Sequence, residues 1–127
     1  MTDNANFCWN ELMTEEVDEA KKFYTAVLGW TFEDMPMPSG KYIVAKANGK
    51  PVGGMMNSAD IEGGDDMPSH WMAYIHVADV DAAVAKVAAA GGEVVKPCFD
   101  VPGVGRIAMV EDPTGAMIGI MTAKPAA

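Results

Sequence analysis

The chain has 127 residues, of which half are hydrophobic and 21% are charged, as in an ordinary globular domain. Eighteen acidic side chains against nine basic ones give a net charge of −9, which repels phosphate backbones and anionic lipid and excludes nucleic acid and membranes as expected partners. No apolar run approaches the roughly 18 residues of a membrane span, and the first residues do not resemble a signal peptide. Cys8 and Cys98 lie far apart, so we expect two reduced thiols and a cytoplasmic location.

The first half of the chain reads as a strand, a helix and further strands. Residues 9–13 are mostly β-formers, and apolar side chains then recur at helical spacing over residues 17–28. Gly29 stands where the end of a helix favours a residue that tolerates positive φ. After one more strand, residues 41–47 and 52–56 flank an Asn-Gly dipeptide, which predicts a β-hairpin.

The second half repeats this order of elements at an offset of 63 residues. Residues 71–77 predict a strand, residues 80–90 predict a helix, and Gly91 stands at the expected helix end. Two further strands, at residues 106–111 and 116–121, flank an Asp-Pro-Thr-Gly turn.

Together the two halves predict an α+β fold made of two βαβββ modules. Module one covers about residues 6–56 and module two about residues 70–122, within a single domain over residues 1–127. Residues 57–69 are rich in Gly, Asp and Ser, which is typical of a surface linker. Because one half alone could bury its sheet only poorly, we expect the two modules to pack as one unit.

Strand parity predicts which side chains share a face of the sheet. In the strand at 71–77, every second side chain is apolar, and these side chains should face the helix of their own half. They are Trp71, Ala73, Ile75 and Val77. The opposite face then carries Met72, Tyr74 and His76, and the 63-residue offset adds Trp9, Glu11 and Met13. This mixture of large apolar, aromatic and ionisable groups predicts a ligand cavity. Cys8 has the other parity, and we expect it to be a buried, inert thiol beneath the helix.

Several stretches resemble signatures of the vicinal oxygen chelate superfamily, which contains glyoxalase I, bleomycin-resistance proteins and extradiol dioxygenases. These stretches are Phe23-Tyr24, Val27-Leu28-Gly29-Trp30, Val80-Asp81, Gly91-Gly92 and Glu111-Asp112-Pro113-Thr114-Gly115. The segments Trp9-Asn10-Glu11-Leu12 and Pro68-Ser69-His70-Trp71 are most similar to a glyoxalase-like branch related to lactoylglutathione lyase. The resemblance implies a curved mixed sheet with a cavity and, as in single-domain relatives, a homodimer.

The resemblance also implies where metal ligands would stand. Metal-dependent members take His or Gln from the first strand of each module and Glu from a later strand. In this sequence the first-strand positions are Trp9 and Met72, and the later positions are Gly53 or Gly54 and Gly119. None of these side chains suits a divalent cation, so we expect no metal at the family's usual site.

A displaced metal site is a disfavoured alternative. Glu11, His70 and His76 share one predicted face, and two His with one carboxylate form an acceptable ligand set. The two histidines are six residues apart on one strand, however, which is about 20 Å at ~3.3 Å per residue. We interpret His70 as a surface residue at a loop end, whereas His76 is either a hydrogen-bonded structural residue or a pocket group.

Glu11 is the candidate catalytic residue. Its strand position predicts a place in the cavity beside Trp9 and Tyr74, where desolvation would raise the pKa of the carboxyl group towards the range of a general base. The hypothesis is that Glu11 binds or deprotonates a ligand, with Tyr74 or His76 as its hydrogen-bond partner. The alternative is a structural bond from Glu11 to a neighbouring tyrosine or backbone amide.

The chain contains eleven methionines, and Met13, Met55, Met72 and Met121 are expected to line the cavity. Methionine adapts to varied apolar shapes, so these residues favour an apolar or aromatic small-molecule ligand. The sequence therefore predicts a metal-free binder, similar to drug-sequestering resistance proteins, or an acid–base enzyme of the isomerase, epimerase or lyase type. The main alternative is a metal-dependent lyase or ring-cleaving dioxygenase with displaced ligands, and a purely structural module is the third.

Overall fold

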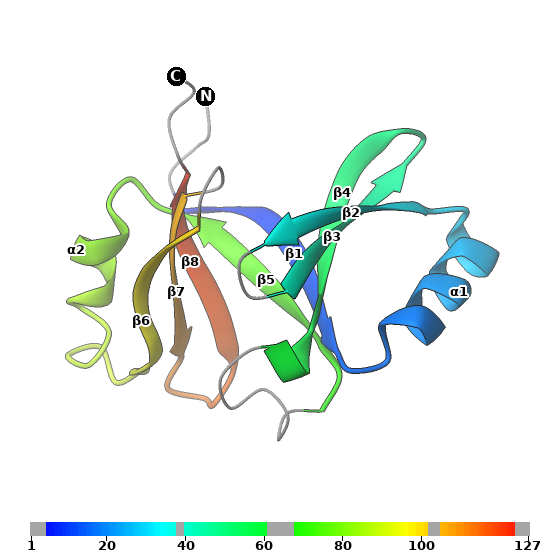
Figure 1. Cartoon of the computed structure of the whole chain (residues 1–127). Coiled ribbons are helices and arrows are strands. Elements are labelled where there is room, and N and C mark those ends of the chain that lie inside the picture. Colours follow the sequence, from blue (N-terminus) through cyan, green and yellow to red (C-terminus); the bar gives the residue numbers. More distant parts are fainter. Residues whose placement is uncertain (1–4, 38–39, 61–67, 102–104, 124–127) are drawn as a thin grey trace. The chain divides into compact units, whose positions relative to one another are not determined.

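A computed structural model describes residues 5–37, 40–60, 68–101 and 105–123 (Figure 1). The chain divides into two compact units. We call Trp9–Met72 the first unit, and Met1–Cys8 together with Ala73–Ala127 the second unit. Each unit contains one α-helix and most of a four-stranded mixed arrangement, because the unit bounds fall within the strands Asn6–Thr14 and His70–His76. No helix in the part of the chain described is long and apolar enough to cross a bilayer.

In the first unit the strands follow the order β2-β3-β4-β1. Strand β1 runs parallel to β4, and the other neighbours are antiparallel. The elements are β1 (Asn6–Thr14), α1 (Val17–Leu28), β2 (Thr31–Met37), β3 (Gly40–Ala47), β4 (Lys50–Asn57) and the 3-10 helix η1 (Ser58–Asp60).

Helix α1 covers one face of the first unit's sheet. Glu16, the residue before the helix, makes no side-chain hydrogen bond that caps its N-terminus. The helix ends at Gly29, whose φ of 74° is the left-handed conformation that glycine tolerates. The core beneath the helix consists of Leu12, Ile43 and Met55, with Val17, Ala20, Tyr24 and Phe32 packed against it. Burial of this cluster fixes which parity of β1 faces the helix.

In the second unit the strands follow the order β5-β8-β7-β6. Strand β5 is parallel to β8, and the remaining pairs are antiparallel. The elements are β5 (His70–His76), α2 (Val80–Val84), β6 (Glu93–Val101), β7 (Gly105–Glu111) and β8 (Met117–Ala123). The core cluster is Val80, Ala108, Val110 and Ile120, and Ile75 and Val77 pack against it, as strand parity predicts.

The predicted helix over residues 80–90 is wrong in its length. Helix α2 ends at Val84, and the chain continues in turns. Backbone hydrogen bonds between residues three apart hold these turns, such as Val87 N–H to Val84 C=O and Gly91 N–H to Ala88 C=O. These are i→i+3 bonds, which tighten the backbone relative to an α-helix. The α+β class and the twice-repeated order of strand, helix and three strands are confirmed.

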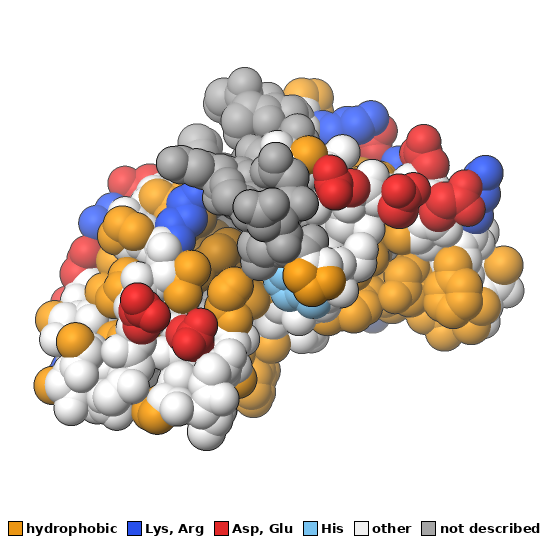
Figure 2. Space-filling model, turned by 90° about the horizontal axis from the view of Figure 1, so that it is seen from below, with side chains coloured by type: hydrophobic (Ala, Val, Ile, Leu, Met, Phe, Trp, Pro, Cys, Tyr) orange, Lys and Arg blue, Asp and Glu red, His pale blue; other side chains and the backbone are white. Residues whose placement is uncertain are grey.

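Trp71 does not face the helix of its own half, contrary to the prediction. Its indole Nε1 donates to the hydroxyl of Tyr24 on α1 at 3.1 Å, and its ring also meets Trp30 edge-on. Phe23 and Val27 of the same helix are 58% and 60% exposed. Figure 2 shows hydrophobic side chains gathered on the right, at the end of the view that carries α1. Residues 61–67 of the predicted linker lie outside the described residues.

Candidate functional site

Each unit has one sheet face that its helix covers and one that it does not, which we call the helix-free face. In the first unit Leu12 packs under α1, so the alternate residues of β1 point to the helix-free face. These are Trp9, Glu11 and Met13. Glu11 is only 5% exposed and Met13 only 2%, while Trp9 is half-buried.

A chain of hydrogen bonds links three side chains on this face. The Trp9 indole Nε1 donates to the hydroxyl of Tyr42 at 2.7 Å, and that hydroxyl is hydrogen-bonded to Glu11. Burial and the negative charge of Glu11 hold the pKa of Tyr42 far above its usual range, so the hydroxyl stays protonated and donates to the carboxylate. Glu11 is therefore bound to a tyrosine from β3, which agrees with the alternative of a bond to a neighbouring tyrosine.

Gly54 makes room for Tyr42. It pairs with Glu11 across β1 and β4, and a Cβ atom at position 54 would lie 1.7 Å from the Tyr42 hydroxyl oxygen. Any side chain at this position would displace the tyrosine that bonds Glu11. The close approach of the tyrosine ring therefore requires a glycine here. The backbone conformation does not, because it is an ordinary strand conformation.

The helix-free face of the second unit is organised in two rows across its four strands. The first row runs from β5 to β6 through Tyr74, Gly119, Met109 and Lys96. The second row runs through His76, Met121, Ile107 and Phe99. Because directly opposed residues point to the same face, these side chains share one surface, and the alternating Ala108 and Val110 face α2.

Gly119 repeats the arrangement of Gly54. A Cβ atom at position 119 would lie 2.2 Å from a ring carbon of Tyr74, its partner on β5. Tyr74 is only 3% exposed, which agrees with a ring laid against the glycine. Each unit therefore holds one tyrosine ring over one strand glycine.

The residues at the family's metal-ligand positions do not fit a divalent cation. Gly54 and Gly119 could not become carboxylates without displacing Tyr42 and Tyr74, and Trp9 and Met72 are not ligands for a hard cation. Within the described ranges, no group of three or more His, Cys, Asp or Glu side chains could hold a metal ion.

The structure places Met55 and Cys8 differently from the predictions, and it defines the surroundings of His70, Met72 and Met121. Met55 belongs to the core under α1, because it pairs with Leu12, and so it does not lie on the helix-free face. Cys8 is exposed, with Sγ 3.6 Å from the Tyr74 carbonyl oxygen, so a buried thiol beneath the helix is wrong. The Nδ1 atom of His70 bonds the Pro68 carbonyl at 2.8 Å. Met72 is 2% exposed and Met121 is 7% exposed.

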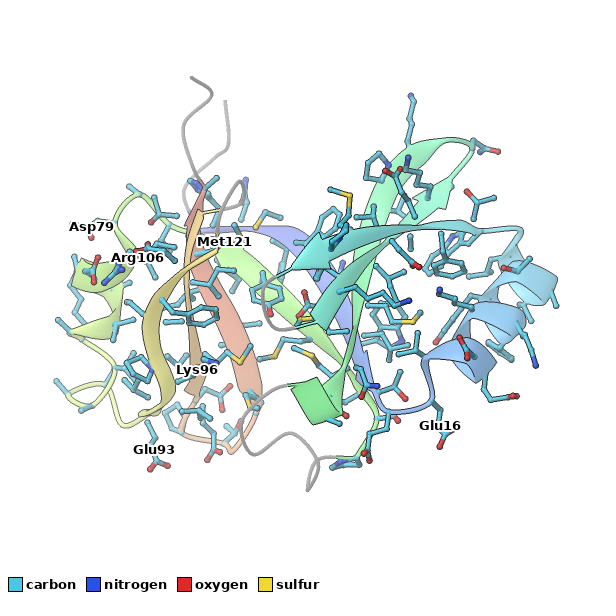
Figure 3. The ribbon with its side chains drawn as sticks, in the orientation of Figure 1. Glu16, Asp79, Glu93, Lys96, Arg106 and Met121 are labelled. Atoms are coloured by element: carbon cyan, nitrogen blue, oxygen red, sulfur yellow. The ribbon has the colours of Figure 1, made fainter. Side chains whose placement is uncertain are left out.

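Arg106 is held at the helix-covered side of the second unit. Its guanidinium binds both carboxylate oxygens of Asp81 on α2, at 2.8 and 3.0 Å, and reaches Asp100 at 3.2 Å. Figure 3 shows Arg106 beside α2. These bonds raise the pKa of Arg106 and lower that of Asp81. The pair is exposed, so it orients side chains more than it stabilises the fold.

Sequence reasoning missed Tyr42, Lys96, Phe99 and Met109. The strand that contains Tyr42 is evident, but its contact with Gly54 depends on the register between β3 and β4. The glycines inside β4 and β8 were the available signal, because a glycine inside a strand marks a close approach. Lys96 and Phe99 lie in an irregular strand. Simple alternation does not predict which face of the sheet their side chains occupy.

The fold and these two faces define a protein of paired βαβββ units. The family model of the Glyoxalase/Bleomycin resistance protein/Dioxygenase superfamily matches residues 7–120. The chain belongs to this superfamily, and the resemblance drawn from the sequence is confirmed.

Relatives and solved structures agree with this family. The chain is 43% identical over 119 residues to a Mycobacterium tuberculosis protein named "Putative glyoxylase CFP32", covering 91% of this chain and 44% of that protein. It is 33% identical over 123 residues to the anthracycline biosynthesis protein DnrV of Streptomyces peucetius, covering 88% and 45% of the two chains. The chain thus spans less than half the length of these curated relatives.

Among solved structures, methylmalonyl-CoA epimerase from Mycobacterium tuberculosis superposes with a TM-score of 0.67. The alignment covers 98% of this chain and 94% of the epimerase at 16% sequence identity. A likeness at this identity concerns the fold, since one fold supports many activities.

The contact between Tyr42 and Gly54 predicts a coupled pair of substitutions. Gly54→Ala should lower the free energy of unfolding by roughly 1–3 kcal/mol, as expected for overpacking. In a Tyr42→Ala background the same change should cost less than ~1 kcal/mol, because the obstructing ring is gone. Urea unfolding of the four proteins measures both costs. Equal costs in the two backgrounds would contradict the contact.

The raised pKa of Tyr42 predicts an alkaline loss of stability. The unfolded chain ionises this tyrosine near pH 10, whereas the folded chain keeps it protonated. The folded state therefore binds more protons above roughly pH 10, and stability falls by up to about 1.4 kcal/mol per pH unit. Unfolding curves of Tyr42→Phe and the wild type between pH 8 and 11 should diverge as pH rises, with the variant less steep. Parallel curves would show that Tyr42 ionises normally.

Proposed function

We propose that this protein binds apolar or aromatic small molecules on each of its helix-free faces, with Glu11 as the polar anchor in the first unit. The observation that carries the proposal is the buried Glu11 carboxylate, bound by the Tyr42 hydroxyl on a face otherwise rich in aromatic and methionine side chains. A buried carboxylate is stable where hydrogen bonds replace its lost hydration, and the Tyr42 hydroxyl supplies one of these bonds. A ligand that donates a hydrogen bond to Glu11 would add another.

Glu11 is also suited to acid–base work if the protein turns its ligand over. In the proposed step the carboxylate takes a proton from a carbon next to a carbonyl group, which leaves an enolate. A proton then returns to another atom of the enolate in an isomerisation or to the opposite face of the same carbon in an epimerisation, whereas in an elimination the electron pair expels a leaving group, which takes up the proton. No oxidant or metal enters this step, so isomerisation, epimerisation and elimination are the reaction classes proposed. The protonated Tyr42 would remain a hydrogen-bond donor throughout, because its pKa is held high.

The curated relatives support a small-molecule ligand. One carries a glyoxylase name and another is named for anthracycline biosynthesis, and the second name agrees with an aromatic ligand. We propose that the protein acts as a homodimer in the cytoplasm, without nucleic acid or membrane partners. Its net charge of −9 supports the exclusion of anionic polymers.

Replacement of Glu11 tests the proposal with N-phenyl-1-naphthylamine, an uncharged aromatic probe that carries one N–H donor. The wild type should bind it with a rise in probe fluorescence, and Glu11→Gln should bind it at least about tenfold more weakly. The reason is that a hydrogen bond to a charged group is worth roughly 1.5–3 kcal/mol. Glu15→Gln, at an exposed position just beyond β1, is the matched control. Equal affinity of the wild type and Glu11→Gln would remove Glu11 from the site.

Metal analysis separates the proposal from a metal-dependent lyase or dioxygenase. Protein purified without a histidine tag is analysed before and after incubation with Zn, Ni, Mn and Fe(II). We expect metal well below one ion per chain in every case, because Trp9, Met72 and the two covered glycines offer no hard ligands. About one ion per chain, lost on Glu11→Gln or His76→Ala, would favour the metal-dependent alternative.

A further inference from the structure

Lys96 is an unusual cation in this acidic protein. Of the lysines that the structure describes, Lys21, Lys22, Lys41 and Lys46 have carboxylate partners. No carboxylate partner is found for Lys96 among the described residues, and unlike the exposed Lys50 and Lys86 it is half-buried. A half-buried charge without a counter-ion is costly to keep, unless another group compensates for it.

Irregular pairing places Lys96 on the helix-free face. Val94 pairs with Val110 and packs towards α2, so an unbroken strand would turn Lys96 to the same side. A register shift follows Val94, and Lys96 pairs instead with Met109, whose neighbours Ala108 and Val110 face the helix. Bulges of this kind re-aim side chains and are common next to binding sites.

A second register shift brings Phe99 to the same face as Lys96. Phe99 pairs with Ile107, and the Lys96 ammonium lies 4.6 Å from the centre of its ring. The ring face attracts the cation and holds it on a face of the sheet that also carries the apolar side chain of Met109. Lys96 is labelled in Figure 3.

An unpaired histidine nitrogen lies on the same surface. His76 stands at the β5 end of the row that Phe99 closes on β6. Its Nδ1 atom is buried and has no hydrogen-bond partner among the residues described. A buried polar atom without a partner requires an explanation, and a ligand or ordered water is a usual one. It is an observation independent of Lys96 and also points to a bound molecule.

We infer that the helix-free face of the second unit binds an aromatic or apolar molecule that carries an anionic oxygen group, held by Lys96. Tyr74, Phe99 and the apolar floor of Ile107, Met109 and Met121 would contact the body of the ligand. A carboxylate, sulfonate or phosphate would satisfy the ammonium, and His76 would bond a second polar atom. This inference rests on the proposed small-molecule function and adds the charge of the ligand.

Two related fluorescent probes test the inference. 8-Anilinonaphthalene-1-sulfonate is anionic, whereas N-phenyl-1-naphthylamine has the same rings without the charge. The wild type should bind the anionic probe more tightly, despite its own net charge of −9, and this preference should weaken with added salt. Lys96→Met should bind the anionic probe about tenfold more weakly and the neutral probe unchanged, while Lys96→Arg should keep the preference.

Lys86→Met is the matched control, because Lys86 is an exposed lysine of the same unit. It removes one positive charge without touching the helix-free face, so it should leave both affinities unchanged. Circular dichroism of each variant checks that the fold is retained. If Lys96→Met binds both probes like the wild type, or if Lys86→Met has the same effect, the inference is overturned and the proposed function stands. If the wild type binds neither probe, both are overturned.

Discussion

The helix-free faces depend on one packing constraint, which is a tyrosine ring laid over a strand glycine. Tyr42 occupies the space beside Gly54, and Tyr74 occupies the space beside Gly119, so neither glycine can carry a side chain. In the metal-dependent relatives implied by the sequence resemblance, a carboxylate would stand at such a position. Here the volume belongs to an aromatic ring. The same contact therefore closes the position to a metal ligand and supplies the hydroxyl that binds Glu11.

The two units repeat one geometry with different charges. Glu11 and Tyr74 are 63 residues apart, and both start a row that continues through a covered glycine. The first row ends at Glu33 and the second at Lys96, which are again 63 residues apart. Glu33 is paired with Lys46, whereas no carboxylate among the described residues pairs with Lys96. The repeat thus places a neutralised acid and an unpaired base at equivalent positions.

Alternation and turn chemistry predicted the parts of this structure that depend on local sequence. The order of elements, the end of α1 at Gly29 and the helix-facing side of Ile75 and Val77 all follow from the residues themselves. The assignment of Met55 was wrong because its facing depends on its pairing with Leu12, which is set by two strands far apart in sequence. A register error of one residue moves a side chain to the other face.

The candidate site residues that the sequence did not predict have one thing in common. Each owes its position to a departure from regular pairing or to a neighbour on another strand. Lys96 changes face at a register shift, and Tyr42 reaches Glu11 only across β4. In the function that we propose, such residues would determine what each face recognises. A carboxylate bound by a tyrosine hydroxyl still accepts hydrogen bonds, so the ligand that we propose for Glu11 is one that donates them. An ammonium group donates hydrogen bonds and accepts none, so the ligand that we propose for Lys96 carries an anionic oxygen. The two covered glycines leave no space for a metal-binding side chain at their positions, so the recognition that we propose rests on hydrogen bonding and charge.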